Sequence, residues 1–98
     1  MNYIKSEKEF NEAIKGEKVI VDFYADWCGP CQMLGPVLEK VSNELGLDTY
    51  KVNVDEVEDV ARSYGIMSIP TVIVFSKGEI VKKNLGYMSE DELKEFVK

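Results

Sequence analysis

Residues 19–24 read Val-Ile-Val-Asp-Phe-Tyr, and this run restricts the fold more than any other segment of the chain. Apolar residues occupy both its odd and its even positions, which is typical of a strand that is covered on both faces. The run therefore predicts the central strand of a sheet that has helices on both sides. Asp22 is its only charged residue.

The flanking segments predict how that sheet is completed. Apolar residues at helical spacing from Met33 to Leu45, ended by Gly46, predict a long helix soon after the central strand. Capping-box sequences begin at Ser6 and Ser89 and predict short helices near both ends of the chain. Further patterns predict strands at residues 2–4, 49–54, 71–75 and 80–85, a hairpin turn at 76–79, and a helix at 55–64 in which Asp55 and Glu58 form a cap pair. This order indicates an α/β fold, a central mixed sheet of four to five strands flanked by helices on both faces.

The composition restricts the classes of function. With 98 residues the chain has room for one hydrophobic core, so we expect a single domain over residues 1–98. With a formal net charge of −6, the chain lacks the excess of basic residues that binds phosphates. We therefore expect no nucleic-acid partner. No apolar run approaches the roughly 20 residues of a membrane span, and charges near the N-terminus interrupt any signal-peptide core. We therefore expect a cytoplasmic monomer with no membrane partner.

Cys28 and Cys31 are the only cysteines, and the chain has no histidine. One chain therefore cannot form a Cys₄, Cys₃His or Cys₂His₂ zinc site, and catalysis by a histidine base is excluded. A disulfide that closes so short a segment would contribute little to the stability of the fold. The pair is better suited to being oxidised and reduced repeatedly than to holding the structure together.

The two cysteines lie in the segment Trp27-Cys28-Gly29-Pro30-Cys31, between the central strand and the long helix. Residues three apart on a helical turn share one face, with Cα atoms about 5–6 Å apart, as a disulfide requires. Cys28 is expected at the helix N-terminus, where free N–H groups and the helix dipole favour a thiolate. Gly29 leaves the approach to Cys28 open, and Pro30 stiffens the first turn. Cys31, one turn deeper, is expected to be less exposed and to act as the resolving thiol.

Other interpretations of the pair stay open. An iron–sulfur or zinc site would have to be shared by two chains, and we rank it below redox chemistry, which needs no metal and no bound cofactor. Inert buried thiols are not expected at the start of a helix. A binding module that docks through Trp27, Ile69 and Pro70, with incidental thiols, would keep its function when both cysteines are replaced by serine.

Several motifs together match a known family: residues 21–31, then Tyr64-Gly65-Ile66, Ile69-Pro70-Thr71, Gly78 and Gly86. With these residues the chain resembles the thioredoxins over nearly its whole length, and the string Trp-Cys-Gly-Pro-Cys is highly specific for them. The resemblance implies a thioredoxin-like fold and the reduction of protein disulfides. It also implies two kinds of partner, disulfide-containing client proteins and a thioredoxin reductase.

Asp22 and Lys51 are the next candidates for the chemistry. As the lone charge in an apolar strand, Asp22 is expected in the interior, where burial raises the pKa of a carboxyl. Such a group can accept a proton from the resolving thiol and return it, although a structural or outward-facing Asp fits the pattern equally well. The resemblance assigns the matching aspartate to proton transfer beneath the cysteines. It pairs this aspartate with the lysine that matches Lys51, which is otherwise a solvated strand residue.

The resemblance also implies a docking surface for clients. Thioredoxins carry a cis proline that faces the active-site disulfide, and Pro70 matches it. The Ile69 backbone is then available to hydrogen-bond an extended client segment. Four apolar residues are expected around Cys28: Trp27, Pro30, Met67 and Ile69. Gly86 is expected either to let a partner backbone approach or to end a strand. Ordinary core packing is the alternative for Met67 and Ile69.

Three positions depart from the family's pattern. Tyr24 stands where many thioredoxins have a second Trp, Gln32 where a lysine is common, and Met67 where the residue is frequently basic. None of them touches the dithiol chemistry. Together they make the surroundings of the cysteines less cationic, which leaves open the clients and whether the reductase is NADPH- or ferredoxin-linked.

Overall fold

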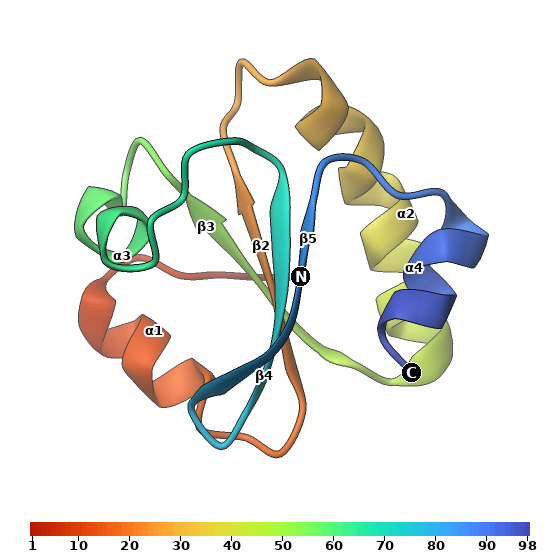
Figure 1. The fold of residues 1–98 in the computed structure, drawn as a ribbon, viewed down its shortest axis with the longest axis horizontal. Coiled ribbons are helices and arrows are strands. Elements are labelled where there is room, and N and C mark those ends of the chain that lie inside the picture. Colours follow the sequence, from red (N-terminus) through yellow and green to blue (C-terminus); the bar gives the residue numbers. More distant parts are fainter.

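Strand β2 (Val19–Tyr24) lies at the centre of a five-stranded sheet, as its apolar sequence predicts. The computed structural model describes residues 1–98 and gives the strand order β1-β3-β2-β4-β5 (Figure 1). β3 runs parallel to β1 and β2, whereas β4 is antiparallel to β2 and to β5. The predicted mixed sheet is therefore confirmed, with these other strands: β1 (Asn2–Tyr3), β3 (Asp48–Asn53), β4 (Thr71–Ser76) and β5 (Glu79–Leu85).

Helices cover both faces of the sheet. In Figure 1, α1 (Glu7–Ala13) and α3 (Glu58–Ser63) lie on the left, and α2 (Gly29–Leu45) and α4 (Glu90–Phe96) lie on the right. Two separate apolar cores result. The core beside α1 and α3 contains Val19, Val21 and Phe23, and the core beside α2 and α4 contains Ile20. Because side chains alternate along a strand, Asp22 lies on the same face as Ile20, beneath α2.

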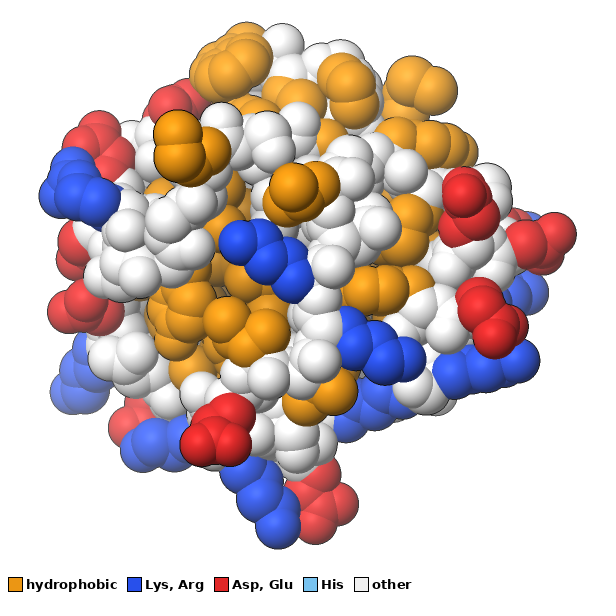
Figure 2. Space-filling view, in the orientation of Figure 1, with side chains coloured by type: hydrophobic (Ala, Val, Ile, Leu, Met, Phe, Trp, Pro, Cys, Tyr) orange, Lys and Arg blue, Asp and Glu red, His pale blue; other side chains and the backbone are white.

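Hydrophobic side chains are also exposed at one end of the molecule. Figure 2, in the same orientation, shows them gathered along the upper edge. The connection from β2 to α2 lies at this end, together with the loops that precede β4 and follow β5 (Figure 1). These connections carry the cysteines and the cis-proline motif, so the apolar surface and the candidate chemistry lie together.

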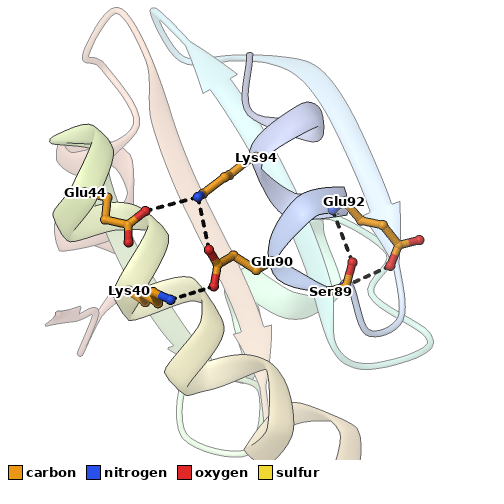
Figure 3. Close-up of polar contacts among 6 residues, drawn as sticks. All are labelled: Lys40, Glu44, Ser89, Glu90, Glu92 and Lys94. Atoms are coloured by element: carbon orange, nitrogen blue, oxygen red, sulfur yellow. Dashed lines mark hydrogen bonds and ion pairs between the residues drawn. The ribbon is translucent and has the colours of Figure 1, made fainter.

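Two predictions for the helices on the α2 side of the sheet are confirmed, the end of α2 and the cap of α4. α2 ends at Gly46, whose φ of 64° is the left-handed conformation that favours glycine. Ser89 and Glu92 form the predicted capping box of α4, and ion pairs among Lys40, Glu44, Glu90 and Lys94 connect α4 to α2 (Figure 3). No helix of the structure has both the length and the apolar composition that crossing a membrane requires.

The predicted helix at residues 55–64 is partly wrong. α3 begins only at Glu58, its N-cap is Val57, and no side chain caps it. The predicted Asp55–Glu58 cap pair does not form because Asp55 lies in the preceding turn, where its side chain has a different partner. At α1 the predicted Ser6 cap forms, but Glu9 accepts a hydrogen bond from the Lys5 N–H rather than from the Ser6 N–H.

Candidate active site

Cys28 and Cys31 form a disulfide at the first turn of α2. Their Cα atoms are 5.2 Å apart, within the predicted range. Cys28 is the N-cap residue, and its Sγ accepts a hydrogen bond from the Cys31 N–H at 3.2 Å. Both are largely buried: Cys31 is 2% exposed and Cys28 5%, so the predicted order of exposure holds by a small margin. In the reduced state the same N–H and the helix dipole favour a thiolate at Cys28.

Asp22 is completely buried and lies opposite Lys51 on the parallel strand β3. The Lys51 Nζ is 3.6 Å from Asp22 Oδ2, and neither Asp22 oxygen has a hydrogen-bond partner. Burial raises the pKa of Asp22 to about 6, against the opposing effect of the Lys51 charge. This carboxyl therefore changes its protonation state close to neutral pH, as an acid–base group in thiol chemistry must.

A cavity of about 380 Å³ connects Lys51 to Cys31. Both Lys51 and Cys31 line it, together with Asp26 and with Glu39 on α2. The register between the strands explains why Lys51 lies beside Asp22 and Tyr3. Tyr3, Lys51 and Asp22 face one another across β1, β3 and β2, so they form a row that passes under the start of α2.

The loop before β4 faces the disulfide. The Ile69–Pro70 peptide bond is cis, and the Ile69 carbonyl oxygen is 3.8 Å from Cys28 Sγ. Neither the N–H nor the carbonyl of Ile69 forms a backbone hydrogen bond, and the same is true of Met67. Gly86 lies beside this loop with a φ of 95°, and its N–H donates to the Pro70 carbonyl at 2.8 Å. This loop therefore presents unpaired backbone groups next to Cys28 Sγ.

Exposed apolar side chains lie on both sides of Cys28 in the chain and in the loop before β4. Trp27 is 73% exposed and Met67 is 95% exposed. Pro30 is exposed as well, whereas Ile69 is half-buried and packs against the cysteine cluster. Gly29 has open space around it. The core-packing alternative is thus wrong for Met67 and partly right for Ile69.

Sequence reasoning missed the role of Asp55. The Trp27 indole N–H donates to Asp55 Oδ2 at 2.8 Å, although the two residues are 28 positions apart. Gln32, a departure from the family's pattern, donates through its side chain to the Asp26 carbonyl. The Trp27–Asp55 contact depends on how the chain returns to this end of the sheet, so no local pattern identifies it. The Gln32 contact is local, within the β2–α2 connection, and no motif of the sequence marks it.

Comparison with known proteins gives one consistent answer. The thioredoxin family model matches residues 2–98. The chain is 42% identical to the thioredoxin of Mycoplasmoides gallisepticum, covering 100% of both chains, and 40% identical to that of Bacillus subtilis, covering 94% of this chain and 90% of the other. The chain belongs to the thioredoxin family. A solved Plasmodium falciparum thioredoxin superposes with a TM-score of 0.93 at 37% identity, covering 99% of this chain and 96% of that one.

Membership of the thioredoxin family establishes the type of chemistry. The chain is a protein thiol–disulfide oxidoreductase whose Cys28–Cys31 disulfide occupies the redox-active position of the family. The thioredoxin fold expected from the sequence is confirmed by the sheet order and by the structural match.

Proposed function

We propose that the chain reduces disulfides in client proteins, with Cys28 as the nucleophile and Cys31 as the resolving thiol. One observation carries the proposal: Cys28 caps α2, and its sulfur lies beside the unpaired backbone of the loop before β4. A thiolate at this position is the nucleophile for disulfide exchange. The neighbouring loop provides a surface on which an extended client segment can be held.

The reaction consists of two exchanges. The reduced Cys28 thiolate attacks one sulfur of the client disulfide, which forms a mixed disulfide and releases the other client sulfur as a thiolate. Cys31 then loses its proton and attacks the Cys28 sulfur. This closes the Cys28–Cys31 disulfide and releases the second client thiolate. The client gains two electrons and, after protonation, two protons, and the chain is left oxidised.

We assign the proton of Cys31 to Asp22. Its pKa of about 6 means that the carboxylate form predominates at neutral pH and can accept a proton. The cavity lined by Cys31 also reaches Lys51, the ion-pair partner of Asp22, which supports this assignment. The ammonium of Lys51 stabilises the carboxylate form, so we assign it a supporting role rather than a proton transfer of its own.

Clients are proposed to bind as an added strand segment at Ile69. The Ile69 N–H and carbonyl are free for main-chain hydrogen bonds, and Pro70 fixes the loop that presents them. Gly86 has no side chain to obstruct the approach of a second backbone. The exposed side chains of Trp27, Pro30 and Met67 supply apolar contacts around the reacting sulfur.

The oxidised chain must be reduced again before the next cycle. We propose a thioredoxin reductase as the donor of the two electrons. The chain would then carry electrons from the reductase to client disulfides. A reducing compartment suits this direction of transfer, so we propose the cytoplasm as its location, with the chain acting as a monomer.

A trapping experiment tests the proposal. Cys31→Ser should accumulate clients as mixed disulfides on Cys28, because the second exchange cannot occur. Cys28→Ser, with Cys31 intact, should trap few or none. If the double serine variant keeps the biological activity, the chain is a binding module instead. A reduction potential above that of the glutathione pool would overturn the proposed direction.

A further inference from the structure

The ring of Tyr24 covers the Lys51 ammonium. The Lys51 Nζ is 4.3 Å from the ring centroid, the distance at which a cation is attracted to the face of an aromatic ring. Tyr24 and Asp22 lie two residues apart on the same face of β2, so the carboxylate and the ring approach the ammonium from one strand. Tyr3 packs edge-on against Tyr24, with ring centroids 6.3 Å apart.

The ammonium has few other contacts that fix its position. At 3.6 Å its ion pair with Asp22 is too long to be a hydrogen bond, and both Asp22 oxygens lack a hydrogen-bond partner. On the side of α2 the ammonium faces Gly35, which has no side chain and where an added Cβ would lie 3.6 Å from Nζ. Since a lysine side chain rotates about several bonds, the Tyr24 ring is the contact that restricts it to the side of Asp22.

We propose that Tyr24 is a positioning residue for the proton transfer, because its ring holds the Lys51 ammonium beside the Asp22 carboxylate. This inference rests on the proposed function, in which Asp22 accepts the proton of Cys31. A nearby ammonium favours the carboxylate over the neutral acid. By fixing that ammonium, Tyr24 sets the pH above which Asp22 is ready to accept a proton.

Other ionisable groups lie near the Asp22–Lys51 pair. Tyr3 from β1, Asp26 after β2, and Cys31 and Glu39 from α2 line the cavity with Lys51. On β4 the residue opposite Asp22 is Val72, and that strand has no ionisable side chain. The pKa of Tyr24 is raised from its ordinary value, mainly by burial, so its phenol stays neutral through the pH range of the test.

The test measures the titration of the Asp22 carboxyl by carbon NMR in the reduced protein from pH 4 to 9. Tyr24→Leu removes the ring face and should raise the titration midpoint by about 0.5 unit or more. Tyr24→Phe keeps the ring and should leave the midpoint near that of the unmodified chain. Tyr50→Leu removes a tyrosine next to Lys51 in sequence but on the opposite face of β3, and should leave it unchanged.

Combined variants separate positioning from packing. In a Lys51→Met background, Tyr24→Leu should cause no further shift. An equal shift in both backgrounds, or an equal shift in Tyr24→Phe and Tyr24→Leu, overturns the inference. If Tyr24→Leu does not fold, pentafluorophenylalanine at position 24 keeps the ring shape but removes its attraction for a cation, and it should reproduce the upward shift.

The pH profile of mixed-disulfide resolution distinguishes this inference from the proposed function. If the titration midpoint moves and the pH profile does not, Asp22 is not the proton acceptor, and the proposed function fails at that step. If neither moves, the inference about Tyr24 is overturned, while the role of Asp22 is still tested by its own substitution.

Discussion

The carboxylate of Asp22 has one charged neighbour, the ammonium of Lys51 at 3.6 Å, and no hydrogen bond to either oxygen. Complete burial therefore acts on this carboxyl with only partial compensation. The same feature that suits it for proton transfer should make the ionised form costly for the folded state.

The stability of the fold should consequently depend on the protonation of Asp22. The pKa of this carboxyl is raised from 3.8 to about 6 in the folded chain. Its contribution to the free energy of unfolding is therefore fully present below pH 3.8 and is lost as the pH rises through 6. The loss is on the order of 3 kcal/mol. Asp22→Asn should therefore be more stable than the parent chain at pH 8 and similar at pH 4. Urea unfolding at both values measures this, and a constant difference between the two proteins would contradict it.

Asp22→Asn should also slow the resolving exchange. The amide cannot accept the proton of Cys31, so release of a client from a mixed disulfide on Cys28 should slow on the order of 10-fold or more near pH 7. The difference should narrow below pH 6, where Asp22 of the parent chain is protonated as well. Single-turnover release from pH 5 to 8 measures the effect. Equal rates for both proteins from pH 6 to 8 would exclude Asp22 as the acceptor.

Asp55 should control the position of Trp27. Asp55→Ala removes the acceptor of the indole N–H and should lower the fluorescence anisotropy of Trp27, the only tryptophan of the chain. Because Trp27 borders the proposed docking surface, KM for a protein disulfide should rise several-fold more than KM for a small disulfide. Glu56→Ala removes the adjacent charge and serves as the control. Asp55→Asn, which keeps an acceptor, should restore most of the anisotropy.

Ser89 should stabilise the α4 end of the fold. Its Oγ accepts from the Glu92 N–H at 3.2 Å, and the Glu92 carboxylate accepts from the Ser89 N–H at 2.9 Å (Figure 3). Ser89→Ala should lower the free energy of unfolding by about 1 kcal/mol, whereas Ser89→Asp, which retains a capping oxygen, should lower it little. Denaturant unfolding of both variants checks this. A loss of equal size in the two would mean that the cap is not the cause.

Local patterns predicted most of the fold because each element has its own signal. The apolar run gave β2 to the residue, and Gly46 marked the end of α2. The expected start of α3 at Asp55 is wrong because residues 55–57 form a turn in which the Asp55 side chain bonds to the distant Trp27. The spacing of Cys28 and Cys31 and their expected position at a helix start predict dithiol–disulfide chemistry.

The surroundings of the site were less predictable, since they depend on the register between strands. A strand pattern indicates that Lys51 and Asp22 belong to neighbouring strands but not that they are opposite each other. The contact between Tyr24 and Lys51 follows from the same register and from the position of α2, neither of which a single sequence pattern specifies.

Strand β5 has a neighbour on one side only, and six of its seven residues are exposed. An edge of this kind offers free main-chain groups to a strand of another molecule. The exposed side chains of Ile80, Val81 and Leu85 would favour such edge-to-edge pairing. Lys82 and Lys83 lie in the middle of the strand, so another copy that paired along it would bring like charges together. The molecule can thus expose apolar side chains at one end while the charges on its edge strand disfavour aggregation through β5.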